Sequence, residues 1–267
     1  MFTEAKRVLK FFFQYFSANL QSAMEYRGAF FSQVVFMFLN NLMLLFFWWV
    51  FFTQVEALNG WLFEHVLLLY AVASGAYACQ ALFFGGSFSL SRAVSEGRLD
   101  FYLALPKPVL LHVLISRSSA SAWGDLCFSL VIFVLTAAPT PGQLLGFLLL
   151  IFTGGVVTTS FAVLAHSLSF WLGQSAQLAD QLTEALLTFS LYPEGIFSAA
   201  TRVVLYTLIP AGFVSYLPVR ILQDFTGIHV GLLLLFALGL LLTARTVFYR
   251  GLRRYESGNL VVLNALD

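Results

Sequence analysis

Long runs of apolar residues alternate along this chain with short charged segments. Residues 28–52 contain no charged residue over 25 positions, and residues 65–84 form a second run of the same kind. Each run is close to the roughly 20 apolar residues that carry a helix across a bilayer. The pattern predicts an all-α integral membrane protein with six spanning helices, the other four at about 116–138, 143–171, 178–197 and 228–248.

The first 24 residues show a different pattern, because apolar and polar side chains fall on opposite sides of a helix. The apolar positions recur at helical spacing, at Leu9, Phe12, Phe13, Phe16 and Leu20. This pattern predicts an amphipathic helix over residues 1–24 that lies at the membrane surface. A cleaved signal peptide is the alternative, but its charges would precede an apolar core instead of following one helix face.

A segment near the C-terminal end is apolar but interrupted. Residues 198–222 contain Pro210 and Pro218, and proline breaks a helix because it lacks the backbone donor. We therefore expect a re-entrant hairpin on the extracytoplasmic side, with its broken backbone shielded by the rest of the protein. Tyr192 and Pro193 precede this hairpin and should end the fifth span.

Several polar residues fall inside the expected spans, where each needs a polar partner or a water-filled path. Two asparagines lie near the middle of the first span, and a polar stripe at three- and four-residue steps follows the third. One interpretation is the lining of a translocation path. The other, which we favour for Asp125, is a structural hydrogen bond or ion pair, because membrane carboxylates commonly pair. The candidates for the path are Asn40, Asn41, Ser118, Ser121, Asp125 and Ser129.

The composition agrees with a membrane protein, and the distribution of charges predicts its orientation across the membrane. Of 267 residues, 60% are hydrophobic and only 10% are charged, whereas soluble domains have about a quarter charged residues. In the six-span topology every Lys and Arg falls on one side except Arg202 and Arg220. By the positive-inside tendency, that side and both termini are cytoplasmic. Cys79 and Cys127 lie in apolar stretches and form no disulfide framework or metal pattern.

The loop between the second and third spans mixes charges with large apolar residues. Within residues 96–109, the stretch Leu99–Leu105 has enough apolar residues for a short helix with one adhesive face. Pro106 and Pro108 should end this helix. From the residues alone, a docking helix and a simple interfacial turn remain equally good interpretations.

Four separated stretches carry a resemblance to a known family. They are GRLDFYLALPKPVLLHVL (97–114), YPEGIF (192–197), IPAGFVSYLPVRIL (209–222) and GLRRYESGN (251–259). In this order, and over nearly the whole chain, they resemble the permease subunits of bacterial ABC-2 type transporters, a group built largely for export. The resemblance implies an inner-membrane permease that works with a separate ATP-binding-cassette ATPase, which binds ATP and Mg²⁺, and with a second permease subunit, identical or related.

In such permeases the first cytoplasmic loop carries a coupling helix that docks into a groove of the ATPase. By this resemblance the coupling residues are Glu96, Gly97, Arg98, Leu99, Asp100, Phe101, Tyr102, Leu105, Pro106 and Lys107. The apolar contacts are expected at Leu99, Phe101, Tyr102 and Leu105. The charged members should set the register, since exposed charge pairs contribute little to affinity. The re-entrant region, with Tyr192, Pro193, Pro210 and Pro218, would cap the path on its outer side.

Motifs for other functions are absent from the sequence, which contains no GxxxxGK[ST], HExxH or GxSxG. We therefore expect a permease that is not itself an enzyme, without a cofactor or metal site, that exports a hydrophobic or amphipathic substrate. Membrane lipid is an expected partner and nucleic acid is not. One alternative is an intramembrane enzyme that uses Asp125 with Asp180 or Glu184, which would have to meet at one depth. Another is an ATP-independent channel or scaffold.

Overall fold

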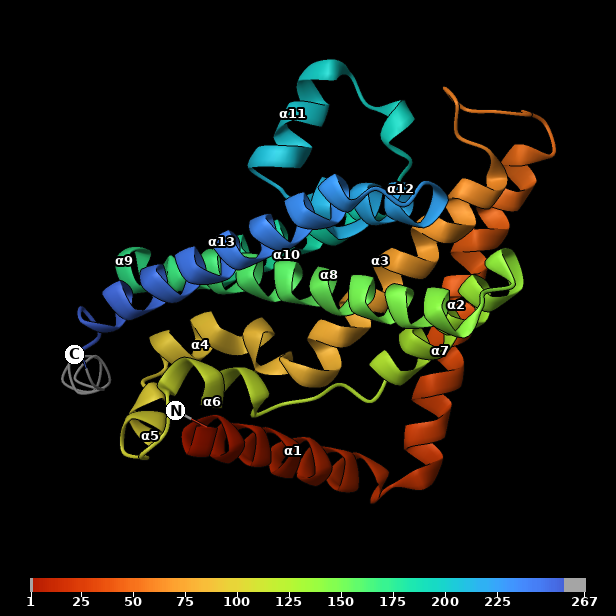
Figure 1. Cartoon of the computed structure of the whole chain (residues 1–267). Coiled ribbons are helices and arrows are strands. Elements are labelled where there is room, and N and C mark those ends of the chain that lie inside the picture. Colours follow the sequence, from red (N-terminus) through yellow and green to blue (C-terminus); the bar gives the residue numbers. More distant parts are fainter. Residues whose placement is uncertain (1, 257–267) are drawn as a thin grey trace, which may run out of the picture.

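The computed structural model describes residues 2–256, and within them the regular structure is helical, apart from one isolated bridge between Leu58 and Trp61 (Figure 1). The first half contains α1 (Phe2–Met24), α2 (Arg27–Phe52), α3 (Phe63–Phe83), η1 (Gly85–Ser89), α4 (Leu90–Ser95), α5 (Leu99–Leu103), α6 (Val109–Ile115) and α7 (Ala122–Ala137). The second half contains α8 (Pro141–Ser167), α9 (Ser169–Leu172), α10 (Ala176–Ser190), η2 (Glu194–Ile196), α11 (Ala199–Thr207), η3 (Gly212–Tyr216), α12 (Leu217–Gln223) and α13 (Gly227–Leu252). The predicted all-α class is confirmed.

Four helical segments in the described part of the chain are long and apolar enough to cross a membrane: α2, α3, α8 with α9, and α13. They match the predicted first, second, fourth and sixth spans. The predicted third span is wrong at its start, because α7 begins at Ala122 and residues 116–121 lie outside any helix. At 16 residues, α7 is about 24 Å long, against a hydrocarbon thickness of about 30 Å. In the region of the expected fifth span, the longest helix is the 15-residue α10, so the count of six spans stays a prediction.

The core of the molecule forms around α3, which packs against α7 and α8. Of the most apolar 18-residue window of α3, 78% is buried, against 17% in both α2 and α13. The close approach of α3 and α8 depends on small residues: a Cβ on Gly155 would lie 2.6 Å from Cys79 Cβ. The rings of Phe133 in α7 and Phe147 in α8 stack at 3.9 Å and join these two helices. The enclosed α3 therefore joins the other long helices, while α2 and α13 present apolar side chains outward.

The predicted interruption of residues 198–222 is confirmed. The axis of α11 and that of residues 212–223 meet at 80°, which is the geometry of a broken span or a re-entrant loop. Pro210 lies in the break, whereas Pro218 stands in the first turn of α12, which follows the π-helical segment η3 (Gly212–Tyr216) directly, and does not interrupt the helix. The buried carboxylate of Glu194 holds the region together, because it accepts hydrogen bonds from Arg220 at 2.8 Å and from Tyr206 at 3.2 Å.

The two residues before this region also behave as the sequence indicates. Pro193 is buried and precedes η2, and α10 ends three residues earlier, at Ser190. Tyr192 is exposed and its ring lies 5.9 Å from that of Trp48 in α2. The helix therefore ends before Tyr192 and Pro193, as predicted, although α10 is shorter than the expected fifth span.

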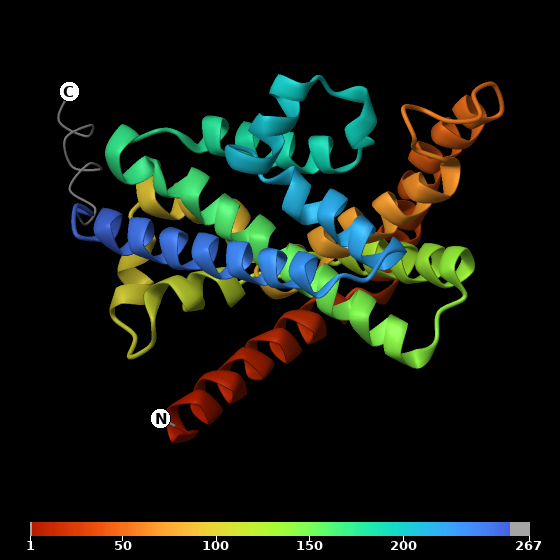
Figure 2. The same cartoon turned by 45° about the horizontal axis from the view of Figure 1, so that its top comes forward.

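The N-terminal helix α1 runs beneath the bundle, with its first turns clear of the other helices in a second view (Figure 2). Its inner face packs through Phe12 and Phe16, whose rings lie 5.9 Å and 5.3 Å from the ring of Phe83 at the end of α3. The amphipathic helix is thus confirmed, while its position at a membrane surface stays a prediction.

Candidate coupling site

The loop between α3 and α7 folds into three short helices, α4, α5 and α6, at the end of the molecule where α1 begins and α13 ends (Figure 1). Gly97 has a φ of +72°, a conformation that glycine adopts without strain, and this residue turns the chain from α4 into α5. A tight turn at Leu105 to Lys107 follows α5, and Pro108 precedes the first residue of α6. The predicted short helix and its proline stop are therefore present.

One side of α5 is buried inside this chain. Leu99 has no exposed surface and lies in an apolar cluster with Leu90 of α4, Val113 of α6 and Phe248 of α13. Tyr102 packs on the same cluster, with its ring 5.0 Å from that of His112 in α6. This corrects the expectation for Leu99, because a side chain fully covered by its own chain anchors α5 and offers nothing to a partner.

Two apolar side chains of α5 are exposed. Phe101 is 64% exposed and Leu103 is 46% exposed, although charged residues surround both along the chain. Leu105 is half-buried and Pro106 is exposed. Sequence reasoning missed Leu103, whose place between Tyr102 and Leu105 on a short helix could be settled only by knowing which face the chain covers. Phe101 and Leu103 form the exposed apolar pair of this site.

The charged residues of the loop hold it at its edges. Arg98 Nε and Glu96 Oε2 form an exposed ion pair at 2.8 Å, a kind of contact worth at most about 1 kcal/mol. The ammonium group of Lys107 lies over the ring of Phe11 in α1, 4.9 Å from its centroid. Both contacts lie within this chain, so the expected role of the charged residues in setting the docking register stays a prediction.

The N-terminal helix α1 braces α6, and through it the candidate coupling segment, residues 96–109. A hydrogen bond of 2.5 Å joins the hydroxyl of Tyr15 to Nε2 of His112, and Asn19 Nδ2 donates to the carbonyl of Ile115 at 3.1 Å. Burial, and next the positive charge of Lys107, lower the pKa of His112 below its usual value. The neutral imidazole is therefore favoured at physiological pH, and its Nε2 can accept the hydrogen bond that the Tyr15 hydroxyl donates.

The C-terminal stretch GLRRYESGN (251–259) contributes Tyr255 to this site, a contact that the sequence does not reveal. Tyr255 follows α13 and packs on the cluster that holds Leu99. Burial, and next the carboxylate of Asp100 in α5, raise the pKa of Tyr255 to about 12, so this phenol stays protonated beside the carboxylate. The last three residues of the motif, 257–259, lie outside the described residues. The end of α13 is thus tied to the helix that was predicted to dock.

A docking element needs exposed apolar side chains on a rigid support. The short helix α5 exposes Phe101 and Leu103, and α4, α6 and α13 support it next to the long apolar helices. A family model described as ABC-2 family transporter protein matches residues 38–258. The chain belongs to the ABC-2 transporter family. No curated protein and no solved structure gives a significant match. Of the four stretches that carry the resemblance, three lie wholly within the matched range, and the fourth, 251–259, extends one residue beyond it.

A second polar cluster of this ABC-2 protein joins the coupling loop to the membrane helices. Ser91 Oγ of α4 lies 2.8 Å from Nδ1 of the buried His166 in α8, and His166 Nε2 lies 3.8 Å from Asp180 Oδ1 in α10. The three residue types would suit nucleophilic catalysis, but Ser91 is fully buried and the distance between His166 and Asp180 exceeds hydrogen-bond reach. The cluster fits a structural link between the three helices.

The residues proposed to line a path separate into two groups in this ABC-2 protein. Asn41 of α2 donates to Asp125 Oδ1 of α7 at 2.7 Å, and Ser129 Oγ donates to the carbonyl of Ala71 in α3 at 2.6 Å, all in buried positions. The structural interpretation thus holds for these residues. Asn40 is exposed, and Ser118 and Ser121 are half-buried before the start of α7. The predicted stripe is therefore wrong over its first half, because the residues there are not helical.

The Asn41 and Asp125 pair allows a matched test of buried polar bonding. We expect Asn41→Leu to lower the free energy of unfolding in detergent by about 1–3 kcal/mol, because it leaves a buried carboxyl group without its donor. The neighbouring Asn40→Leu, at an exposed position, should change it by less than about 0.5 kcal/mol. The pair Asn41→Leu with Asp125→Leu should recover most of the loss, since both polar groups are removed. Equal losses at Asn40 and Asn41 would contradict this account.

Proposed function

We propose that this ABC-2 family member is the permease subunit of an ATP-driven exporter, and that α5 docks into a groove on a separate ATP-binding-cassette ATPase. The observation that carries the proposal is the exposed apolar pair, Phe101 and Leu103, on a helix that Leu99 and Tyr102 fix to the rest of the chain. Apolar side chains exposed on a rigid support are what a protein groove binds with least loss of conformational entropy.

The attachments of α5 would pass its motion into the membrane helices. Through α4 and η1 the chain continues into α3, the enclosed helix of the core, and through α6 it continues towards α7. The hydrogen bond from Ser91 adds a link from α4 to α8. The partner would bind ATP and Mg²⁺, so the chemistry of hydrolysis would take place there. A shift of α5 when the ATPase closes would then rearrange α3, α7 and α8 and change access to the path.

A second permease subunit, identical or related, would complete the path. The outward apolar faces of α2 and α13 give this chain two surfaces that lipid or another subunit would cover. The distribution of basic residues supports cytoplasmic termini and a cytoplasmic α5, within a bacterial inner membrane. The apolar, Ser- and Thr-bearing helices are compatible with a hydrophobic or amphipathic substrate, and export follows the resemblance to exporters.

Affinity purification of the tagged full chain in mild detergent tests the proposal. We expect an ATPase with a phosphate-binding loop to purify with the chain, and the eluate to hydrolyse ATP in the presence of Mg²⁺. Mass spectrometry of the eluate identifies the partner, and a mock purification from untagged cells supplies the control. If no nucleotide-binding protein associates with a correctly inserted chain, the ATP-independent channel or scaffold becomes the better description.

A further inference from the structure

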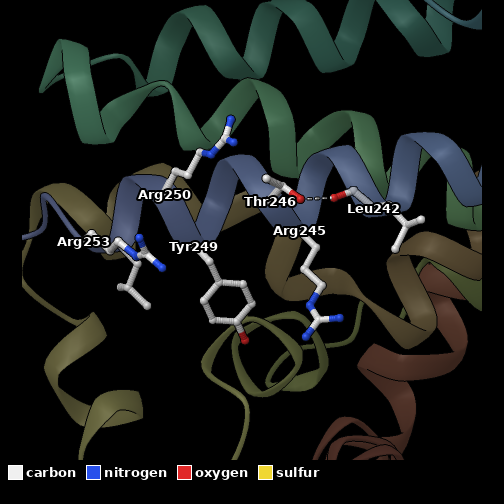
Figure 3. Close-up of a pocket in the computed structure, with 7 residues that line it drawn as sticks. Leu242, Arg245, Thr246, Tyr249, Arg250 and Arg253 are labelled. Atoms are coloured by element: carbon white, nitrogen blue, oxygen red, sulfur yellow. Dashed lines mark hydrogen bonds between the residues drawn. The ribbon is translucent and has the colours of Figure 1, made fainter.

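A groove of about 840 Å³ follows the outer surface of α13 near its C-terminal end (Figure 3). Its walls are two ridges of side chains spaced four residues apart, because residues at this spacing lie above one another on a helix. One ridge is Leu242, Thr246 and Arg250, and the other is Arg245, Tyr249 and Arg253. In Figure 3, Arg250 points to one side of the helix while Arg245 and Tyr249 point to the other, so the groove has basic side chains on both walls.

The three arginines of the groove have charges that the described chain leaves unneutralised. Arg245, Arg250 and Arg253 are all exposed, and none lies within 4 Å of a carboxylate among residues 2–256. Arg245 lies over the ring of Tyr249, 5.9 Å from its centroid, which holds its guanidinium group along the groove wall. Guanidinium groups bind phosphate and carboxylate oxygens through paired hydrogen bonds, so this groove suits an anionic ligand.

Beyond the other end of the groove, the outer surface of α13 is aliphatic. Leu242 lies at that end, and the outer surface of α13 beyond it carries further exposed leucines, Leu234, Leu235, Leu238 and Leu241. These leucines belong to a helix that is long and apolar enough to cross a membrane. A ligand that follows the surface from the arginines to the leucines therefore has an anionic head and an aliphatic tail. A free anion would use only the basic end.

We propose that this groove binds an anionic phospholipid, with the phosphate held by Arg250 and Arg253 and an acyl chain along Leu242 and the leucines beyond it. Arg245, on the same wall as Arg253, would neutralise the remaining charge of the headgroup. Because Tyr255 ties the end of α13 to Asp100 of α5, a lipid in this groove would lie next to the coupling segment. Lipid binding itself does not depend on an ATPase partner.

Native mass spectrometry of the full chain in mixed micelles tests the proposal. The probes are phosphatidylglycerol and phosphatidylcholine of identical acyl chains, and we expect the chain to retain the anionic lipid preferentially. Arg250→Gln with Arg253→Gln should weaken that retention by roughly thirtyfold, since each direct guanidinium–phosphate contact in the groove is worth at least about 1 kcal/mol. Arg250→Lys with Arg253→Lys should keep most of the preference, because the charges remain.

A pair of exposed arginines outside the groove provides the control. Arg27→Gln with Arg117→Gln removes the same charge and should leave the preference within about twofold, because neither residue lines the groove. Equal loss in this control would overturn the proposal in favour of attraction by net charge alone. Competition by inorganic phosphate as effective as by phosphatidylglycerol would also overturn it, because the site would then bind the free anion. Unchanged retention by the glutamine pair in the groove would refute it outright.

Discussion

The double variant Phe101→Asp, Leu103→Asp is expected to lose its ATPase partner while remaining folded. Both side chains are largely exposed in the isolated chain, so two carboxylates at these positions cost little in folding. In a docked complex they would enter an apolar groove of the ATPase. Central apolar contacts contribute about 2 kcal/mol or more each, so losing both should weaken association about a thousandfold. The measurement is the amount of ATPase and of ATP hydrolysis recovered with the tagged variant.

Two further variants separate docking from folding and from simple charge effects. Glu96→Gln with Arg98→Gln removes an exposed ion pair of the same loop, and at least half of the ATPase should remain associated. Leu99→Asp should instead reduce the yield of folded chain, because it places a charge in the buried cluster. If the Phe101 and Leu103 variant retains its ATPase in full, the docking surface lies elsewhere. In that case α5 would be an interfacial turn that rests in the lipid headgroups.

Gly86→Ala is expected to disrupt the junction between η1 and α6, with a loss of about 3 kcal/mol or more in the free energy of unfolding. A Cβ at this position would lie 1.8 Å from the carbonyl oxygen of Val113 and 2.8 Å from its carbonyl carbon. These are backbone atoms, so the clash cannot be relieved by a side-chain rotation. Either η1 or α6 must move, and α6 carries the bracing contacts of the coupling segment.

The thermal unfolding midpoint of the variant in detergent measures this effect, and Gly231→Ala is the matched control. Gly231 lies in α13 with nothing within 4 Å of its added Cβ, so alanine there should be neutral or slightly stabilising in a helix. A Gly86→Ala chain as stable as this control would show that η1 and α6 do not pack as closely as the structure places them.

The runs of uncharged residues located the long helices correctly, whereas the spacing of polar residues misplaced the start of α7. Uncharged runs longer than about 20 residues indicate spans because a bilayer demands them, and α2, α3, α8 and α13 lie where such runs lie. The start of α7 was misplaced because Ser118 and Ser121 fit a helical stripe by spacing alone. Spacing shows where residues would lie only if the segment is helical. Here residues 116–121 are not helical, and they contact α3 before α7 begins: the Ser119 N–H donates to the carbonyl of Ala81.

The candidate site shows the same division. The loop, its short helix and its proline stop could be read from charges, apolar residues and prolines. The roles of Leu99 and Leu103 could not be predicted from the sequence. Both are leucines on one short helix, and only the packing of α4, α6 and α13 decides that Leu99 is buried and Leu103 is exposed. Tyr255 and Asp100 are more than 150 positions apart in the sequence, and no local pattern relates them.

By itself the sequence determined that this chain is a helical membrane protein, where most of its long helices run, and which loop interrupts them. These features depend on hydropathy and backbone chemistry, which are properties of each segment alone. The tertiary structure alone decided which apolar faces are internal and which are outward, and which polar groups meet, as Asn41 meets Asp125. In a membrane protein, residues that face lipid and residues that face other helices are both apolar, so the pattern that identifies a span cannot say what covers it.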